Sequence, residues 1–397
     1  MPTRGLVGSV HNLNPITMAS IFSLPPEILS EIATFVAHED FAPPIRLLLT
    51  SKTWSEIVLN TPSAFSALSI ECSLDPSDPC IEVISRWIER SGISPLFITL
   101  DLRLTDHTAV PFLLPGSPLH KRHEHIRELH IHHPSAWNLW NLDHLWPAPS
   151  LRSLFIVHDD ASVFEAHLEL IEFPVFLRNT MQAPQLRTLK LNHCRFDKPA
   201  SDLPALEELE ASSCVASTHG LRGMLLSCRH LQRLVLKDFS IEDGYTSILT
   251  GAHLQEIHLD YTWSIKLHVH SPLWILQGIS TPALTHLTLS CANLSQESLE
   301  YMHRFIGQTH IQLRYLGLTL IGAHLPSSIV LPELVHLETL HIIVRNLYYH
   351  PRAVLRHPSL TEFKLRYEPR PSNIVEWEEL FSHDDRFSVE CSLFNDA

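Results

Sequence analysis

The side chains that could carry out chemistry in this chain are its histidines. They number 28 among 397 residues. The densest group comprises His120, His123, His125, His130, His132 and His133. Imidazole is a zinc ligand, and His130 and His132 would share one face of a strand. However, no cysteine or carboxylate recurs at ligand spacing, and there is no H-E-x-x-H motif. We therefore expect exposed histidines and no metal.

Other catalytic arrangements are missing from the sequence. It contains no G-x-S-x-G, G-x-G-x-x-G, Walker-type G-K-[ST] or C-x-x-C motif. The acid pairs 159–160 and 384–385 fall in expected loops without a positioned partner. Cys228, beside Arg229 and His230, could be an activated thiol. A helical apolar stripe places Cys228 in the core instead. We expect no enzyme and no cofactor.

Composition limits the classes of partner and the cellular compartment. The net charge of −14 argues against nucleic-acid binding, which requires a basic face. No apolar run is long enough to span a membrane, and residues 1–20 lack a secretory signal, so we expect a disordered tail there. Seven scattered cysteines favour reduced thiols in the cytoplasm or the nucleus.

The second half of the chain is repetitive. A phrase L-x-x-L-x-L, with Ile or Phe as substitutes, starts at Ile126, Leu151, Leu186, Leu206, Leu231, Leu254, Leu284, Leu313, Leu337 and Leu360. The spacing matches leucine-rich repeats, whose period is about 20 to 29 residues. Phe97, Leu100 and Leu102 are interpreted as an earlier copy.

Each phrase predicts a short strand whose alternate apolar residues face a shared core. Helical segments are expected between the phrases, for example Leu221 to Cys228, Ser271 to Ile279, and Ser295 to Ile306. No unit buries its apolar face alone, so the units must stack. The predicted fold class is α/β, a solenoid with parallel strands on the concave side and helices on the convex side.

The strand pattern also predicts which side chains line the concave face. These are the third, fifth and seventh residues of each phrase. The candidate target-binding residues among them are Lys190, Glu210, Arg233, Lys237, His258, Asp260, Tyr315, His341, Lys364 and Arg366. Their mixed signs favour a protein or peptide partner over a polyanion. A merely solvated sheet face is the alternative.

A small helical module precedes the repeats. Pro25 and Pro26 suit a first helical turn, and Glu27 complements the helix dipole there. Thr50 or Ser51 can cap a third helix that carries Trp54 inward. Three short helices are too few to bury a self-sufficient core. We therefore expect the module to pack on another domain or on another protein.

This segment resembles an F-box. The matching residues are Leu24, Pro25, Glu27, Ile28, Leu29, Ile32, Phe35, Ser51, Lys52 and Trp54. The resemblance implies docking on the Skp adaptor of a cullin-RING ubiquitin ligase. The adaptor-binding residues it implies are Leu24, Pro25, Pro26, Glu27, Ile28, Leu29, Ile32, Leu47, Leu48 and Trp54. The run 37–44 is longer than is usual in the family. A capping bundle for the repeats is the alternative.

The expected organisation follows from these patterns. It comprises a tail (1–20), the F-box module (21–70), a linker helix (71–95), the solenoid (96–370) and a C-terminal cap (371–397). The expected function is that of a target-recognition subunit of an SCF-type ubiquitin ligase, with an unknown target protein and no membrane or nucleic-acid partner. The alternative is a leucine-rich interaction scaffold without a ligase role.

Overall fold

The computed structural model describes most of the chain between residues 21 and 391. The described residues are 21, 24–40, 42–71, 79–102, 116–132, 148–157, 171–172, 183–196, 203–241, 249–250, 253–261, 276, 279–292, 296–307, 312–321, 328–330, 334–345, 352–354, 362–368 and 387–391. The expected tail, the acid pairs, His133 and most of the expected C-terminal cap lie outside them. Within the described residues, no helix is long and apolar enough to cross a membrane.

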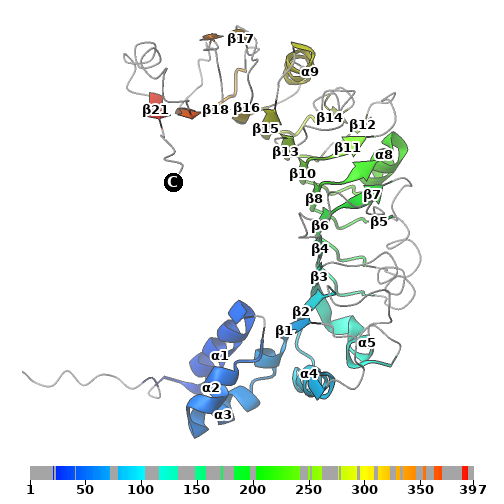
Figure 1. The fold of residues 1–397 in the computed structure, drawn as a ribbon, viewed down its shortest axis with the longest axis vertical. Helices are drawn as coiled ribbons and strands as arrows, with labels where there is room; N and C mark the ends of the chain where they lie inside the picture. The colour runs from blue at the N-terminus through cyan, green and yellow to red at the C-terminus, as the bar shows by residue number, and fades with distance from the viewer. Residues whose placement is uncertain are drawn as a thin grey trace, which may run out of the picture.

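A 13-stranded parallel sheet forms the body of the molecule. In spatial order its strands are β1 (Ala67–Glu71), β2 (Leu96–Asp101), β3 (Ile126–His132), β4 (Ser153–Val157), β6 (Thr188–Asn192), β8 (Glu208–Ser212), β10 (Arg233–Lys237), β13 (Glu256–Tyr261), β15 (His286–Ala292), β16 (Tyr315–Ile321), β18 (Thr339–Arg345), β20 (Glu362–Glu368) and β21 (Phe387–Cys391). The strands follow one another in chain order along an open arc, with one face concave (Figure 1). The predicted α/β class with parallel strands is confirmed.

Alternation of side chains explains why these segments are strands. In β6, Leu189 and Leu191 are buried while Thr188, Lys190 and Asn192 are half-exposed. The same alternation recurs in β4, β8 and β13. The inward leucines and isoleucines of the coils from β1 to β18 form one continuous core. Each coil therefore covers the apolar face of its neighbour, as the phrase spacing predicted.

The β2 phrase differs from the prediction by one residue. Leu96, Ile98 and Leu100 are buried, and Phe97 is half-exposed. Leu100 and Leu102 are buried as predicted, but the regular alternation of β2 places Phe97 on the face opposite to Leu96 and Ile98. Phe97 consequently belongs to the concave face.

Helices and short strands both occur on the described part of the convex side. The helices there are α4 (Pro79–Arg90), α5 (Pro118–Lys121), α8 (Thr218–Ser227) and α9 (Gln296–Ile306), with the 3-10 turn η4 (His123–His125). The short strands form three small sheets. One contains β5 (Ile171–Glu172), β7 (Cys194–Phe196), β9 (Val215–Ala216) and β11 (Ser240–Ile241); the others pair β12 (Leu249–Thr250) with β14 (Ile279–Ser280) and β17 (Ser328–Val330) with β19 (Arg352–Val354). The predicted helix 271–279 is thus wrong at its end, since Ile279 lies in β14.

A left-handed residue turns the chain from the main sheet into the small one. Positive φ occurs at His193 (58°), Ser213 (50°) and Asp238 (47°), each one residue past the end of its main-sheet strand. The amides of Ser213 and Asp238 donate to the carbonyls of Lys237 and Asp260 on the next coil. These bonds hold a conformation that costs about 1–2 kcal/mol for a residue with a Cβ.

The helical module lies at the N-terminal end of the arc (Figure 1). It consists of α1 (Pro26–Asp40), α2 (Ile45–Thr50), α3 (Lys52–Leu59) and the 3-10 turn η2 (Pro62–Phe65). Pro26 opens α1, where a missing amide costs nothing. The hydroxyl of Ser51 caps α3 by accepting from the amide of Trp54, at 3.2 Å. The three predicted helices and the Ser51 cap are present.

Candidate functional site

The helical module has its own small core. Leu29, Ala33, Trp54, Val58 and Phe65 are buried within it. Two of the residues expected to contact an adaptor, Leu29 and Trp54, are each only 3% exposed. They hold the helices together and form no part of the outer surface.

The outer surface of the module is unusually apolar. Five exposed large side chains lie on its first two helices or just before α1, and we call them the module patch: Leu24 (39% exposed), Ile28 (40%), Phe35 (66%), Ile45 (45%) and Leu49 (81%). Pro25, Pro26 and Glu27 are also exposed, while Ile32, Leu47 and Leu48 are half-buried. Ile28 and Phe35 stand seven residues apart and so share one side of α1. Phe35, Ile45 and Leu49 were not among the predicted adaptor residues.

The module is joined to the arc by specific contacts. The ring of His38, in the last turn of α1, lies 4.7 Å from the Phe97 ring of β2 in an edge-on arrangement. His38 Nε2 is also 3.2 Å from the hydroxyl of Ser66. Trp87 of α4 packs against both the module core and the arc core. Burial lowers the pKa of His38, and the Glu128 carboxylate opposes this shift.

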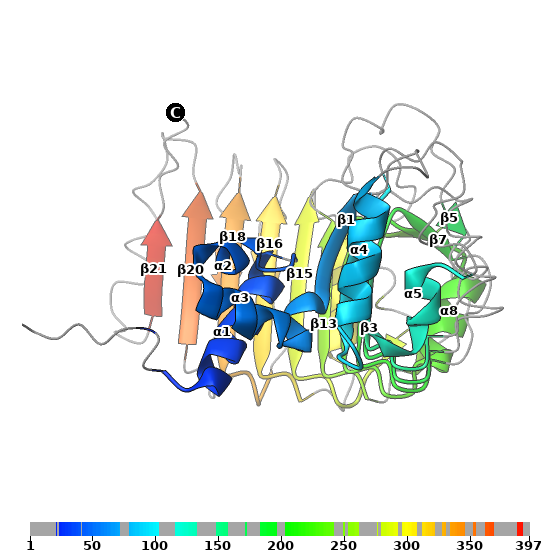
Figure 2. The same ribbon diagram turned by 90° about the horizontal axis from the view of Figure 1, so that it is seen from below.

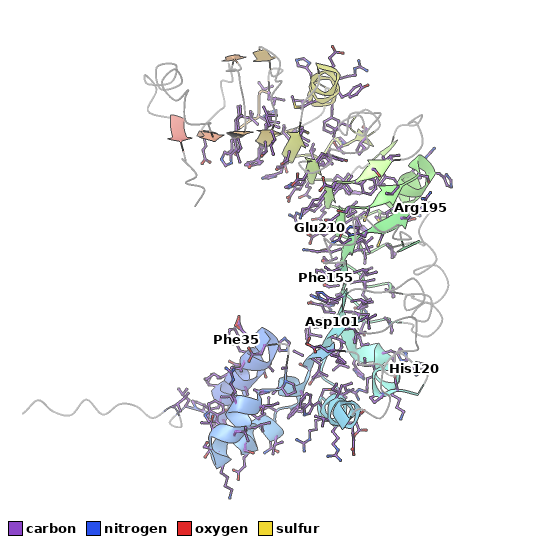
Figure 3. The ribbon with its side chains drawn as sticks, in the orientation of Figure 1. Phe35, Asp101, His120, Phe155, Arg195 and Glu210 are labelled. Atoms are coloured by element: carbon purple, nitrogen blue, oxygen red, sulfur yellow. The ribbon has the colours of Figure 1, made fainter. Side chains whose placement is uncertain are left out.

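A shallow cavity of about 470 Å³ opens beside α1. Its lining residues are Ser30, Glu31, Thr34, Phe35, His38 and Ser63. The hydroxyls of Thr34 and Ser63 are hydrogen-bonded at 2.7 Å on its floor. Phe35 projects from α1 toward the space enclosed by the arc (Figure 3). The cavity contains no arrangement of nucleophile and base.

The concave face presents three parallel rows of side chains, one per outward position of each strand. The predicted residues Lys190, Glu210, Arg233, Lys237, His258, Asp260, Tyr315 and His341 all lie in these rows. Lys364 and Arg366 continue the rows in β20 by backbone register. Their side chains lie outside the described part. Phe155 and Glu210 point to the concave side in Figure 3.

The middle of the concave face is organised by ion pairs between coils. Glu210 accepts from Lys237 and lies 3.3 Å from Lys190 Nζ, so one carboxylate joins three strands. Burial alone would raise the pKa of Glu210. The two ammonium groups outweigh this effect and hold that pKa below its usual value. Glu210 is therefore ionised, and its charge is compensated within the face.

A second ion-pair chain runs beside the first. Arg233 donates to Glu208 on one side and to Glu256 on the other, the latter at 3.0 Å. The bond to Glu256 raises the pKa of Arg233, although partial burial opposes it. Because both chains are internally paired, the centre of the face is rigid and nearly neutral.

Aromatic rings flank this centre on the N-terminal side. The ring of His130 lies 4.1 Å from that of Phe155, and Lys190 Nζ stands 5.4 Å above Phe155. His130 Nε2 is 2.8 Å from Glu128. The sequence prediction listed concave residues only from the third phrase (Leu186) onward, so it did not include Phe155 and Glu128. The same rule applied to the phrases at Ile126 and Leu151 would have found them.

A second aromatic group lies on the C-terminal side. Tyr315 stacks on His286 at 5.7 Å and its hydroxyl is 3.1 Å from His341 Nδ1. Gly317 makes room for this ring, since a Cβ there would come within 3.2 Å of it. Nearby in the rows, burial lowers the pKa of His258 although Asp260 acts against this.

The described histidines are spread over both sides of the arc, and the cysteines whose side chains are described are buried. His120 lies on the convex side in Figure 3, whereas His130 and His132 belong to the concave β3. Among the described residues, no group of three or more His, Cys, Asp or Glu is placed to hold a metal. Cys228 is buried, as its helical stripe predicted. Burial raises the pKa of the Cys291 thiol to about 12. A hydrogen bond with Cys214, together with burial, raises that of Cys194.

Comparison with known proteins adds no relative. No model of a known protein family matches the chain, and no curated protein is significantly similar to it. The features that bear on function are therefore the module patch, the concave face and the sequence pattern.

Proposed function

We propose that this chain is a target-recognition subunit of an SCF-type cullin-RING ubiquitin ligase. Residues 21–70 act as an F-box that docks on a Skp-type adaptor, and the leucine-rich repeats hold a target protein on their concave face. The chain itself makes and breaks no bond. Its contribution is to position the target, which raises the effective concentration of target lysines near a bound ubiquitin-conjugating enzyme.

The observation that carries this proposal is the module patch. A module whose only task is to cap a solenoid would bury its large apolar side chains against the arc. Here Phe35 and Leu49 are 66% and 81% exposed, and Leu24 and Ile28 beside the prolines remain accessible. Apolar patches of this kind mark protein interfaces. The F-box resemblance names the class of partner.

The concave face supports the second half of the proposal. It is broad and curved, and its aromatic and charged side chains are held by contacts between coils. Such pre-organisation lowers the entropy lost on binding, and buried Tyr and Arg side chains are typical anchors of interfaces. Tyr315 and Arg233 are the best placed anchors, because both are fixed by neighbours on two sides.

Co-expression with a Skp-type adaptor tests the proposal. The wild-type chain should copurify with the adaptor. The single change Leu49→Asp, and separately the double change Leu24→Asp with Pro25→Ala, should each reduce recovered adaptor by about tenfold or more, since burying an unpaired carboxylate is costly. A matched control is Ile93→Asp: this residue is 87% exposed and lies in the turn after α4, outside the module.

The controls decide between the outcomes. Circular dichroism must show that each variant folds like the wild type, and the Ile93→Asp variant should retain the adaptor. Affinity purification under proteasome blockade should then recover both the adaptor and an enriched target. If the folded wild type copurifies with no Skp-type adaptor, the ligase role is wrong.

One observation favours the scaffold alternative. The module core merges with the arc through Trp87, and Arg90 stands 5.7 Å above the Phe65 ring. A bundle that merely closes the first coil would make the same contacts. Retained target binding together with absent adaptor binding would identify the chain as a leucine-rich interaction scaffold.

A further inference from the structure

The edge of the sheet at the N-terminal ends of the strands carries a charge pattern unlike the rest of the chain. This edge is the lower one in Figure 2. In each successive coil, one residue lies immediately before the first strand residue whose side chain faces the concave side. From β3 to β18 these edge residues are Arg127, Arg152, Arg187, Glu207, Gln232, Gln255, Thr285, Arg314 and Glu338. The first three are consecutive arginines, which we call the arginine edge.

Backbone hydrogen bonds fix these arginines side by side. The amide of Arg152 donates to the carbonyl of Arg127 at 2.7 Å, and the amide of Arg187 donates to that of Arg152 at 2.8 Å. Their backbones are therefore about 4.8 Å apart, the spacing of hydrogen-bonded strands. Like charges on neighbouring strands repel one another, so this arrangement does not favour folding.

Internal partners do not neutralise the arginine edge. Arg187 lies 3.3 Å from Glu207, which ends the basic run. In the part of the chain that the structure describes, no carboxylate is within ion-pair distance of Arg127 or Arg152. By contrast, Arg233, Lys190 and Lys237 on the concave face are all paired. Arg127 and Arg152 therefore place two adjacent positive charges on a chain with a net charge of −14.

We propose that the arginine edge binds an acidic polypeptide segment, one rich in Asp and Glu. The guanidinium fork pairs with carboxylates through two parallel hydrogen bonds, and every cation of the run is arginine rather than lysine. Carboxylates three or four residues apart on a helix are about 5–6 Å apart, close to the spacing of the edge. The proposal goes beyond the ligase role and does not depend on it.

A nucleic acid is a less suitable ligand. Phosphate backbones bind extended basic surfaces. The arginine edge is short, and Glu207 and Glu338 interrupt the row further along. A short carboxylate cluster fits this limited surface better than a continuous polyphosphate.

Peptide binding to the full-length chain tests the proposal. The probe is a fluorescein-labelled Glu-rich peptide measured by fluorescence anisotropy at low ionic strength, against the same peptide with Gln in place of Glu. The wild type should prefer the Glu peptide by about tenfold. The double variant Arg127→Gln, Arg152→Gln should lose that preference. The variant Arg127→Lys, Arg152→Lys should lie between the two, because it keeps the charge and loses the fork.

A charge-matched control separates local binding from net charge. Lys52 and Arg86 are exposed, and each pairs with a glutamate four residues away on its own helix. The double variant Lys52→Gln, Arg86→Gln loses the same charge and should bind the Glu peptide like the wild type. An equal loss in both double variants would overturn the proposal, as would no preference for Glu over Gln.

Two further probes test whether the ligand of the arginine edge is a carboxylate-rich peptide. A phosphoserine peptide that binds more than about tenfold tighter than the Glu peptide would overturn carboxylates as the ligand. Preferential binding of a single-stranded oligonucleotide would overturn the peptide assignment. Adaptor copurification is measured separately with the same variants, so failure here leaves the test of the ligase role untouched.

Discussion

The imidazole of His38 meets the ring of Phe97 edge-on, with 4.7 Å between the ring centroids. This contact joins the last turn of α1 to the second strand of the arc. The pair is accompanied by the bond between His38 and Ser66, so the same imidazole holds two successive coils. The orientation of the module is thus set by side-chain contacts as well as by the chain connection.

The first prediction concerns this joint. Replacing Phe97 with Ala should lower the free energy of unfolding by about 1–3 kcal/mol, since a half-exposed ring loses apolar contacts and its edge-on partner. Denaturant unfolding measures the change. A matched control is Phe155→Ala, a half-exposed ring at the middle position of a strand that does not touch the module. Of the two, only Phe97→Ala should increase amide exchange in α1.

The second prediction concerns Glu210. The change Glu210→Gln should cost about 1–2 kcal/mol of stability, because Lys190 and Lys237 lose a charge-assisted partner in a partly desolvated site. The pKa of Glu210 is lowered in the folded chain. The contribution of Glu210 to stability is therefore complete above the pKa that Glu210 has in the unfolded chain. It is lost as the pH falls through the lower pKa of Glu210 in the folded chain.

Glu82→Gln is the matched control for Glu210. Glu82 forms an exposed pair with Arg86 on α4, and such pairs contribute about 0–1 kcal/mol. Chemical denaturation at neutral pH and again at acidic pH gives the comparison. Equal costs for the two variants at neutral pH would contradict the interpretation of the concave ion pairs.

The third prediction concerns the left-handed corners. Ser213 has a φ of 50°, and Ser213→Gly should raise the free energy of unfolding by about 0.5–1 kcal/mol because glycine adopts this region without a Cβ penalty. The reverse change at another left-handed residue, Gly92→Ala, should lower it by about 1 kcal/mol. Thermal unfolding measures both. Destabilisation by Ser213→Gly would show that the hydroxyl, not the backbone, matters there.

The fourth prediction concerns Gly317. Gly317→Ala should cost about 1–3 kcal/mol, because its Cβ would press on the Tyr315 ring at 3.2 Å. In a Tyr315→Ala background the same change should cost much less. This double-mutant cycle isolates the contact. Equal costs in the two backgrounds would mean that the strain lies in the backbone.

The fifth prediction is a pH dependence at His258. Burial lowers its folded pKa from 6.5, so the unfolded chain binds a proton more readily. The stability due to neutral His258 is complete above about pH 6.5 and is lost as the pH falls through the folded pKa. The stability difference between the wild type and His258→Gln should therefore shrink from pH 8 to pH 5. A constant difference would exclude His258 as the titrating group.

Much of the arc follows from the sequence. A phrase such as Leu186 to Leu191 fixes both a strand and its buried side, because alternation is a local property of the chain. The Ser51 cap of α3 was found for the same reason. The short convex strands were missed, since two or three residues carry no periodicity that distinguishes them from a loop.

The missed parts of the candidate site have another cause. Sequence periodicity places Lys190, Glu210 and Lys237 on one face, but the choice of partner depends on rotamers and on the register between coils. Phe97 was misplaced for a different reason, because the β2 segment alternates apolar residues from Leu96 onward and its phrase was started one residue too late. The exposure of Leu49 could not be read from its apolar run Leu47–Leu49, because three adjacent apolar residues on a short helix cannot all face one core.

The shared packing of Trp87 fixes more than local stability. Because the Trp87 indole packs against both the module core and the arc core, it restricts rotation of the helical module relative to the arc. Anything seated on α1 and α2 is consequently held at a set offset from anything lying in the hollow of the arc. The distance between a partner on α1 and α2 and a partner on the concave face is therefore set by the fold.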